Sequence, residues 1–547
     1  MRIDRLMFWP IKRDFSMKRI LLTIATLSFA TVATPRGPTE TPLTFAVNTV
    51  NDGPDQVLNG VCDTGDGVDG AECTLRAAIQ EANANPGRDA IEFEIAGCPD
   101  KTCVIEIDTT GGNPLPDIQS PVVIDGATQF GNESVCTADI PDRPAYRVVL
   151  EGAGDELGMH LASGSDGSVI RGLNLRNFTN AIQVTGSNQN RIECNFIGTD
   201  ETGMSVGQNQ TGSGVLFQCE SNANIVGGTG IGAGNLISGN ATDGVQFLGV
   251  DCKPMAGSAP TDNAVLANFI GVARDGVTPL GNGLAGVSFF GQPGADGNFV
   301  GVLPDATTVR GNVIGANGTS GILIDGDPGG MDGTDRTVVM GNYLGTDRSG
   351  TIDLGNFFAG VDILIGDNNV IGGGNAGSAN VIAFNGEGVY LELDAGTGNR
   401  ITQNRIFDNI GLGIELIDDS GIPGETPNDP GDTDHGANRL QNWPEIFGAE
   451  EGGGQLSITY EVDSATLPIE VEFFIADADG TEGMRFIGAD DYTTAGTAVA
   501  VIPADPVEIG ERILSTATDA DGNTSEFSPS VSAVFLDRLF RDGFESP

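Results

Sequence analysis

The sequence predicts an all-β protein whose main part is a right-handed parallel β-helix, and two repeats carry this prediction. An Asn-aromatic-aliphatic-Gly tetrad begins at Asn195, Asn268 and Asn342, at intervals of 73 and 74 residues. A Gly followed by alternating apolar residues returns at shorter intervals, the shortest running 25 residues from Gly388 to Gly413. A unit of that length cannot bury its apolar side alone, so the units must stack into a solenoid.

The composition of each unit fits one coil of such a solenoid. Alternate Leu, Ile, Val and Phe residues point into a shared interior, and Gly and Asn suit sharp corners with positive φ. Coils spaced roughly 4.8 Å apart would let Asn side chains at equivalent corners form hydrogen-bonded ladders. Longer units then carry loops inserted at one corner. A propeller would need regular blades of about 40 residues with a blade signature, and the sequence has neither. We expect the coils to be right-handed, because connections between parallel strands of one sheet are almost always right-handed.

Composition and charge limit the classes of partner that the chain can bind. The chain has 547 residues, 81 Gly and a formal net charge of −48, and after residue 18 its only lysines are Lys101 and Lys253. An acidic balance of this size disfavours nucleic acid and anionic membranes as direct partners. Cations and sugars remain open.

The N-terminal segment, residues 1–33, predicts a secretory signal. Lys18 and Arg19 precede an apolar run over residues 20–33 that ends in small residues, and Met17 is well placed to be the true start. The run is too short to span a bilayer, and no later stretch is long enough. We therefore expect a secreted protein that is extracellular or held at the cell surface.

The cysteine count agrees with export. An even number, 8, favours disulfides over metal ligands or catalytic thiols in an exported chain. Short intervening loops favour pairing Cys62 with Cys73 and Cys98 with Cys103. The remaining partners, Cys136, Cys194, Cys219 and Cys252, stay open, with Cys194 to Cys219 between adjacent coils as the candidate pair.

Residues 34–89 form the expected N-terminal cap region. Residues 43–50 alternate like a strand, and a helix over residues 74–83 follows an acidic loop. Thr74 is a suitable N-cap, and Pro86-Gly87 ends the helix. Its apolar face combines Leu75, Ala78, Ile79 and Ala82. Such a helix before the first strand would cover the open apolar end of the solenoid.

This region also resembles a known family. The segment CTLRAAIQEANANPGRDAIEF, residues 73–93, resembles the signature of the CSLREAI domain, found at the N-terminus of exported bacterial right-handed β-helix proteins. Thr74 replaces Ser, and Ala77 replaces a Glu that would complete a capping box. The motifs NFIGTD, GNLISGN and NVIGGG, and residues 428–446, are similar to the repeats and the end of the same proteins. The resemblance implies a β-helix of the pectate-lyase-like class and says little about activity.

The expected domains follow in order. The β-helix covers residues 90–420, and a Pro-, Gly- and Asp-rich linker covers residues 421–445. An immunoglobulin-like β-sandwich covers residues 446–536, because short strands at 456–462, 469–475, 498–502, 513–517 and 530–535 alternate with turn residues. Residues 537–547 form a tail that is either a last strand or a sorting tag.

The strand register predicts which side chains leave the interior. If Val389 and Leu391 point inward, Tyr390 and Glu392 point outward. The same register gathers acids on one outer face, where earlier coils have none: Asp325, Asp362 and Glu415. On that face, Asp325, Tyr390 and Glu415 are the candidate carbohydrate-binding residues.

Asp362 and Glu392 are the candidate catalytic pair. Their diagonal offset on adjacent coils puts them roughly 7 to 8 Å apart, within the range for an acid and a base that flank a glycosidic bond. The competing interpretation, which we favour, is a solvated acidic face. His160 and His435 are the only histidines, which argues against a His-based triad or a zinc site.

Calcium is the candidate cofactor, since several carboxylate clusters offer hard oxygen ligands at short spacing. The first cluster comprises Asp325, Asp327, Asp332 and Asp335, with Arg336 beside it as the candidate base of a lyase. The others are Asp429, Asp432 and Asp434, and the run Asp519, Asp521 and Asn523. Asp and Asn are also ordinary turn formers, and that interpretation is favoured for each cluster.

The expected function is binding of an extracellular polysaccharide or adhesion, without a clear catalytic site. The alternative is a polysaccharide lyase or glycoside hydrolase of pectate-lyase-like fold. A groove in which the two carboxylates converge would favour hydrolysis. A flat face would favour binding or a purely structural role.

Overall fold

The computed structural model describes residues 41–65, 72–98, 102–107, 114–207, 212–250, 252, 259–291, 294–303, 310–326, 333–464, 466–503, 507–508 and 510–535. The expected signal (1–33) and tail (537–547) lie outside the described residues. Within those residues, no helix is both long and apolar enough to cross a membrane.

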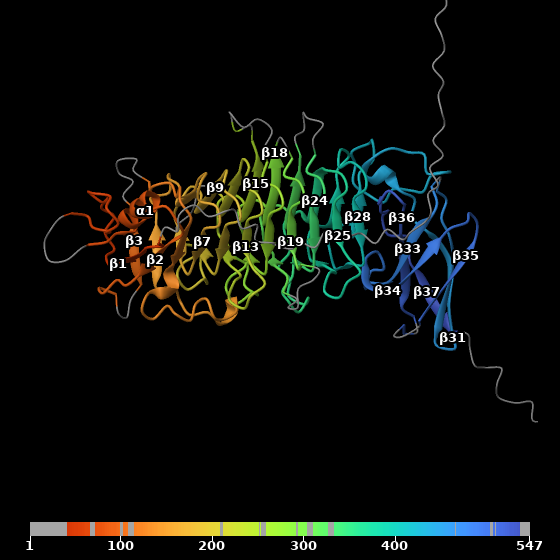
Figure 1. Cartoon of the computed structure of the whole chain (residues 1–547). Helices are drawn as coiled ribbons and strands as arrows, with labels where there is room; N and C mark the ends of the chain where they lie inside the picture. Colours follow the sequence, from red (N-terminus) through yellow and green to blue (C-terminus); the bar gives the residue numbers. More distant parts are fainter. Residues whose placement is uncertain are drawn as a thin grey trace, which may run out of the picture. The chain divides into compact units, whose positions relative to one another are not determined.

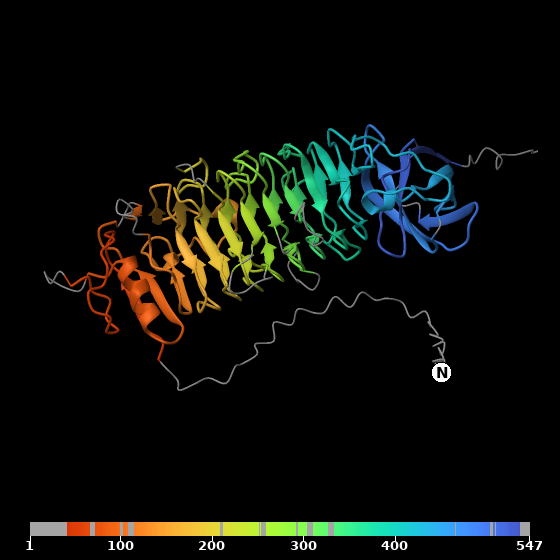
Figure 2. The ribbon, with the colours of Figure 1, turned by 90° about the horizontal axis from the view of Figure 1, so that it is seen from above.

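Three parallel sheets, called here A, B and C, stack coil upon coil (Figures 1 and 2). Sheet A comprises β1 (Thr44–Val47), β2 (Asp89–Phe93), β4 (Val122–Asp125), β7 (Val169–Arg171), β10 (Arg191–Glu193), β13 (Ile225–Gly227), β16 (Ala264–Leu266), β19 (Phe299–Gly301), β22 (Val338–Met340), β25 (Val370–Gly372) and β28 (Arg400–Thr402). Sheet B comprises β3 (Cys103–Glu106), β5 (Val148–Glu151), β8 (Asn174–Arg176), β11 (Phe196–Ile197), β14 (Leu236–Ile237), β17 (Phe269–Ile270), β20 (Val313–Ile314), β23 (Tyr343–Leu344), β26 (Val381–Ala383) and β29 (Arg405–Phe407). Sheet C comprises β6 (Met159–Leu161), β9 (Ile182–Thr185), β12 (Val215–Gln218), β15 (Val245–Gly249), β18 (Val287–Gly291), β21 (Ile322–Asp325), β24 (Ala359–Ile365), β27 (Glu387–Leu391) and β30 (Ile414–Leu416).

From β4 onward each coil contributes one strand to each sheet, and strands at equivalent positions in successive coils pair in parallel. Val389, for example, pairs with Val361 below and Ile414 above. Val389 and Leu391 are fully buried, as the predicted register requires. The predicted right-handed parallel β-helix is confirmed.

The interior repeats from coil to coil because equivalent positions lie directly above one another. The rings of Phe217, Phe247 and Phe289 stack nearly parallel, with centroids 4.8 and 4.9 Å apart. Such stacking adds aromatic contact to ordinary apolar burial.

Asparagines at one corner form the expected ladder. Asn195, Asn268 and Asn342 of the three tetrads belong to it, and all three are fully buried. Each Asn side chain accepts hydrogen bonds from the Asn of the preceding coil and donates to the next. The ladder runs through Asn195, Asn235, Asn268, Asn312, Asn342, Asn380 and Asn404.

The N-terminal cap contains the predicted helix. Helix α1 spans Leu75–Ala84, and the Thr74 side chain accepts from the N–H of Ala77 at 3.0 Å. The helix packs against β1 and β2. The predicted strand at residues 43–50 becomes β1, which pairs in parallel with β2. The helix therefore follows the first strand of the solenoid instead of preceding it.

Seven strands after the solenoid form the predicted immunoglobulin-like sandwich. They are β31 (Glu445–Gly452), β32 (Gln455–Glu461), β33 (Ile469–Ala476), β34 (Gly483–Tyr492), β35 (Ala498–Pro503), β36 (Arg512–Thr518) and β37 (Val531–Phe535). One sheet orders β31, β32 and β35, the other orders β34, β33, β36 and β37, and β37 also pairs with β31. Strands β31 and β34 were not predicted, because their sequences lack strict apolar alternation.

The sandwich packs on the last coil. Glu482 accepts from the backbone and the side chain of Asn409 at 2.9 and 3.0 Å. Glu526 accepts from the backbone N–H groups of Leu416 and Thr426 at 3.0 and 2.9 Å. Residues 421–445, expected as a linker, contain the short helix η3 (Ala437–Leu440). There Asn438 accepts from the N–H of Asn399 and so extends another asparagine stack.

All eight cysteines form disulfides. The pairs Cys62–Cys73 and Cys98–Cys103 are confirmed. The expected pair Cys194–Cys219 is wrong, because Cys194 bonds to Cys136 and Cys219 bonds to Cys252. Cys194 follows a strand of sheet A and Cys219 follows a strand of sheet C, so they lie at different corners of their coils.

Candidate functional site

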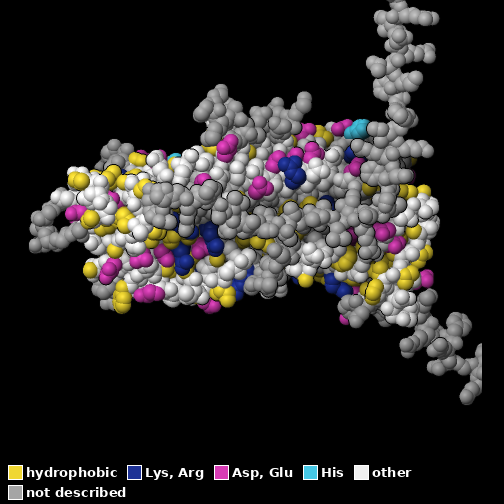
Figure 3. All heavy atoms as spheres, in the orientation of Figure 1, with side chains coloured by type: hydrophobic (Ala, Val, Ile, Leu, Met, Phe, Trp, Pro, Cys, Tyr) yellow, Lys and Arg dark blue, Asp and Glu magenta, His cyan; other side chains and the backbone are white. Residues whose placement is uncertain are grey.

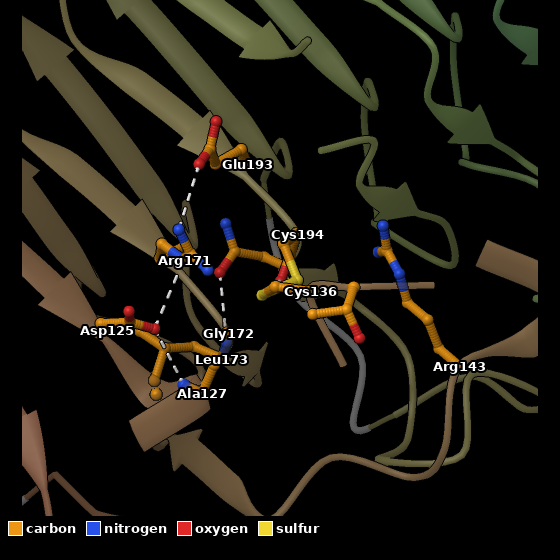
Figure 4. Close-up of a disulfide and its surroundings, with 12 residues drawn as sticks. Asp125, Ala127, Cys136, Arg143, Arg171, Gly172, Leu173, Glu193 and Cys194 are labelled. Carbon is orange, nitrogen blue, oxygen red and sulfur yellow. Dashed lines mark hydrogen bonds and ion pairs between the residues drawn. A yellow bond between two sulfur atoms is a disulfide. The ribbon is translucent and has the colours of Figure 1, made fainter. Parts of the chain in front are cut away.

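The middle of the outer face of sheet B, which points away from the coil interior, is covered. Residues between β4 and β5 cross it, held by the Cys136–Cys194 disulfide (Figure 4). Tyr146 from this segment packs on Phe196 with ring centroids 4.2 Å apart. The outward side chains beneath it are buried: Phe196, Leu236, Phe269 and Val313. Further along, Phe407 of sheet B packs with Met484 of the sandwich.

Beside this disulfide, an ionic bridge lies on the neighbouring sheet A. Arg171 lies between Asp125, at 3.4 Å, and Glu193, at 3.7 Å (Figure 4). Beyond it, five successive positions in an outer row of sheet A are apolar. They are Ile225, Ala264, Phe299, Val338 and Val370, of which Ala264 is buried and the others are half-buried. Such a row offers no hydrogen-bonding side chains to a polar ligand.

Sheet C differs, because its outer face carries two rows of mainly polar side chains in strict register. The first row runs through His160, Gln183, Leu216, Gln246, Ser288, Leu323, Asp362, Tyr390 and Glu415. The second runs through Thr185, Gln218, Leu248, Phe290 and Asp325. This is the face that the sequence singled out.

The N-terminal half of this face is a network of amides, hydroxyls and one imidazole. The ring of His160 hydrogen-bonds Asp117 at 2.8 Å and Thr185 at 3.0 Å. Gln183 donates to Gln218 at 3.3 Å. These side chains are half-buried, so they are held in place while still reaching the surface. No sequence signal marked them, since single Gln and Thr residues are common.

The middle of the face carries two apolar side chains and, beside them, a buried acid. Phe290 is 40% exposed beside Leu248. Asp243 accepts from the N–H of Ala285 at 3.0 Å and from Gln246 at 3.1 Å. Burial raises the pKa of Asp243 to about 6, although the hydrogen bond from Ala285 opposes the rise.

In the C-terminal half of this face the predicted acids lie close together, but most of them are buried. Asp362, Tyr390 and Glu415 occupy equivalent positions, as predicted, whereas Asp325 pairs with Ile365 because the register shifts after Ile324. Asp325, Asp362, Tyr390 and Glu415 are all buried, however, and only Glu392 is half-exposed. Phe358 packs edge-on against Tyr390 with centroids 4.9 Å apart, and Gly424 donates its N–H to Glu415 at 2.9 Å. The expectation of an open acidic face is not met, because Phe358 packs on Tyr390 and the segment after β30 reaches Glu415.

Asp362 has the most unusual environment of this group. Burial raises its pKa to about 7, and the nearby charges of Glu392 and Asp325 add to the rise. The Ser320 hydroxyl donates to Oδ2 at 3.1 Å, whereas Oδ1 has no hydrogen-bond partner among the described residues. A carboxyl that is protonated near neutral pH beside other carboxylates can act as a general acid.

The first predicted calcium cluster is only partly observed. Asp327 and Asp332 lie outside the described residues. Asp335 accepts from the N–H of Asp367 at 2.8 Å, and Arg336 pairs with Asp296 at 2.8 Å. Arg336 is thus engaged in an ion pair.

The other clusters differ from each other. Among the described residues, only Asp429, Asp432 and Asp434 bring three carboxylate oxygens within 4.8 Å of one another, as a calcium ion would need. Asp519 instead accepts from backbone N–H groups of its own turn, including those of Asp521 and Asn523. His435 is exposed and is not one of the residues that form this cluster. Elsewhere, acidic side chains are scattered over the face in Figure 3 and do not gather in one patch.

No family model and no curated protein matches the chain. Among solved structures, the mannuronan C-5 epimerase AlgE4 A-module of Azotobacter vinelandii matches at 14% identity and TM-score 0.34, over 64% of this chain and 88% of that one. The catalytic domain of a GH87 alpha-1,3-glucanase in complex with nigerose matches at 12% and 0.35, over 72% and 65%. The Dettilon tailspike protein matches at 12% and 0.29, over 86% and 90%. All three TM-scores lie below 0.5, so no property of these proteins is carried over to this chain.

Proposed function

We propose that this protein is exported and binds an extracellular polysaccharide along the outer face of sheet C. The observation that carries the proposal is the group of half-buried polar side chains on strands β6 to β15, which lies next to the exposed ring of Phe290 on β18: His160, Gln183, Thr185, Gln218 and Gln246. Pre-positioned polar groups next to an apolar surface suit a sugar chain, which presents hydroxyls at its edges and C–H groups on its ring faces.

The charge of the chain narrows the class of polysaccharide. Gln183, Gln218 and Thr185 are neutral, and the whole chain carries a formal charge of −48. A polyanion would be repelled by the field of the protein. A neutral polysaccharide is therefore the proposed ligand.

Two further features support an extracellular setting. Four disulfides involve all eight cysteines, and such bonds persist in oxidising compartments. The segment at residues 1–33 has the composition of a secretory signal. Helix α1, capped by Thr74, is also compatible with the resemblance to CSLREAI-domain proteins, and we retain that membership as part of the proposal.

The test is a binding panel with the purified protein. Soluble neutral glucans, mannans and galactans and polygalacturonate are compared by affinity electrophoresis, with and without calcium. We expect retardation by a neutral polymer that is lost when Gln183, Gln218 and Phe290 are all replaced by Ala. Glu92→Ala, on the exposed outer face of β2 in sheet A, is the matched control. Equal retardation of both variants would contradict the proposed face.

Hydrolysis is the second candidate function, and the raised pKa of Asp362 beside Glu392 is the observation that favours it. One carboxyl would protonate the leaving oxygen while the other acts as base or nucleophile. Reducing ends are followed on the same panel. Turnover that disappears in both Asp362→Asn and Glu392→Gln would establish the enzyme. Glycan binding without turnover would leave the binding function alone.

A further inference from the structure

A second concave site lies where the last coil meets the sandwich. The pocket has a volume of about 370 Å³ and is bounded by the turn before β30, by the loop between β33 and β34, and by the segment before β37. Ligand sites of about 300–1,000 Å³ occur preferentially at such junctions between structural units. It shares no residue with the two rows on sheet C.

The apolar part of the pocket is rigid. It includes Leu412, Phe527 and Pro529. The Phe527 ring fits between two glycines: a Cβ on Gly413 would lie 2.9 Å from it, and a Cβ on Gly483 would lie 2.7 Å from it. The ring also packs edge-on against Phe474, with centroids 5.6 Å apart. These contacts fix the aromatic wall before any ligand arrives, which lowers the cost of binding.

The polar part of the pocket carries both signs of charge, with acids in excess. Arg512 is half-buried and donates to the backbone carbonyl of Ala478. Glu425, Asp479 and Thr481 also line the pocket, and all three are exposed. Their carboxylates and hydroxyl can accept or donate hydrogen bonds at the edge of a ligand, while the two acids disfavour an anion.

We propose that this pocket binds one or two sugar units that carry no negative charge. The exposed Pro529 and the accessible edge of the largely buried Phe527 suit the C–H groups of a sugar ring. The acids and Thr481 suit its hydroxyls. A uronic acid would meet Glu425 and Asp479 with like charge. The proposal is independent of sheet C, since it concerns a separate pocket at the end of the coil stack.

The test uses the full-length exported protein and small defined sugars. Binding of maltose, cellobiose, diacetylchitobiose and digalacturonic acid is measured by calorimetry and by saturation-transfer NMR. We expect at least one neutral disaccharide to bind and digalacturonic acid not to bind. Thr481→Trp places a large side chain at the pocket and should weaken this binding at least about tenfold. Thr493→Trp, at an exposed site of the sandwich away from the pocket, is the matched control.

The possible outcomes distinguish sugar binding in this pocket from sugar binding on the outer face of sheet C. Loss of disaccharide binding in Thr481→Trp, with binding retained in the triple Ala variant of Gln183, Gln218 and Phe290, supports the pocket. Absence of binding by every neutral disaccharide would overturn it, as would equal affinity for digalacturonic acid. Unchanged affinity in Thr481→Trp, with both tryptophan variants melting at the wild-type temperature, would overturn it as well.

Discussion

At the scale of single residues, buried asparagines stabilise the corners of the coils. Asn268 is a representative example. Its Oδ1 accepts from the backbone and the side chain of Asn235 at 2.8 and 3.0 Å. Its own side chain donates to the Val226 carbonyl at 2.9 Å and to Asn312 at 3.1 Å. A short side chain with both a donor and an acceptor is required, and only Asn provides it at this length.

We expect Asn268→Ala to destabilise the protein by about 3 kcal/mol, because it leaves the buried donors of Asn235 without an acceptor. The measurement is urea unfolding, with amide hydrogen exchange to locate the loosened coils around β14 and β17.

The control for this substitution is Asn375→Ala, since Asn375 is exposed between β25 and β26. A surface change of this kind should stay within about 0.5 kcal/mol of the wild type. Equal losses in the two variants would show that the ladder has no special role.

At the scale of elements, the segment between β4 and β5 acts as a cover for sheet B. Asp139 in this segment pairs with both Arg310 and Arg348 at 2.7 Å. Burial alone would raise the pKa of Asp139, but Arg348 and Arg310 hold it below its ordinary value. The guanidinium of Arg348 also lies 4.7 Å above the Phe269 ring. The Cys136–Cys194 disulfide fastens one end of this cover.

Replacing Cys136 and Cys194 together by Ser should lower the free energy of unfolding by up to about 4 kcal/mol, the loop-entropy value for this separation. It should also increase binding of an apolar dye, because the cluster on sheet B becomes accessible. Replacing Cys219 and Cys252 removes a bond away from this cluster and should leave dye binding unchanged. Peptide mapping without reductant checks the pairing, and a Cys194–Cys219 peptide would contradict it.

At the scale of the whole molecule, buried carboxylates join the sandwich to the last coil. Glu472, Glu482 and Glu526 accept hydrogen bonds that a further coil would otherwise accept. Burial raises the pKa of each, to about 8 for Glu482 and Glu526. The sandwich thus covers the end of the solenoid with buried carboxyl groups. Their ionisation, which occurs as the pH rises, is unfavourable in the folded state.

The stability should therefore depend on pH. A carboxyl with a raised pKa binds its proton more tightly in the folded state, so its stabilisation is complete below the ordinary value of 4.5 and is lost as pH rises through about 8. The free energy of unfolding should fall between pH 5 and pH 9, by at most about 1.4 kcal/mol per pH unit for each group.

Glu482→Gln tests the source of this dependence. The variant cannot ionise at this position, so its unfolding free energy should vary less with pH than that of the wild type, whatever its value at pH 7. Glu450→Gln, on the partly exposed part of β31, is the control and should keep the wild-type slope. A wild-type stability that rises between pH 5 and pH 9 would contradict the assignment.

The sequence by itself determined the solenoid, its register and its asparagine ladder. These follow from local rules: alternation fixes which side of a strand is buried, and spacing fixes which residues stack. Val389 and Leu391 point inward, and Thr74 caps its helix, because each depends on near neighbours in the chain. Five strands of the sandwich were predictable for the same reason.

Only the tertiary structure decided what covers each face. The burial of Tyr390 and Glu415 depends on contacts outside their own strands, such as those with the ring of Phe358 and the backbone of Gly424. The partner of Cys194 depends on a segment that crosses sheet B, and the pocket beside Phe527 exists only because a second domain packs on the last coil. Contacts between distant segments depend on three-dimensional packing, and the periodicity of the sequence does not predict them.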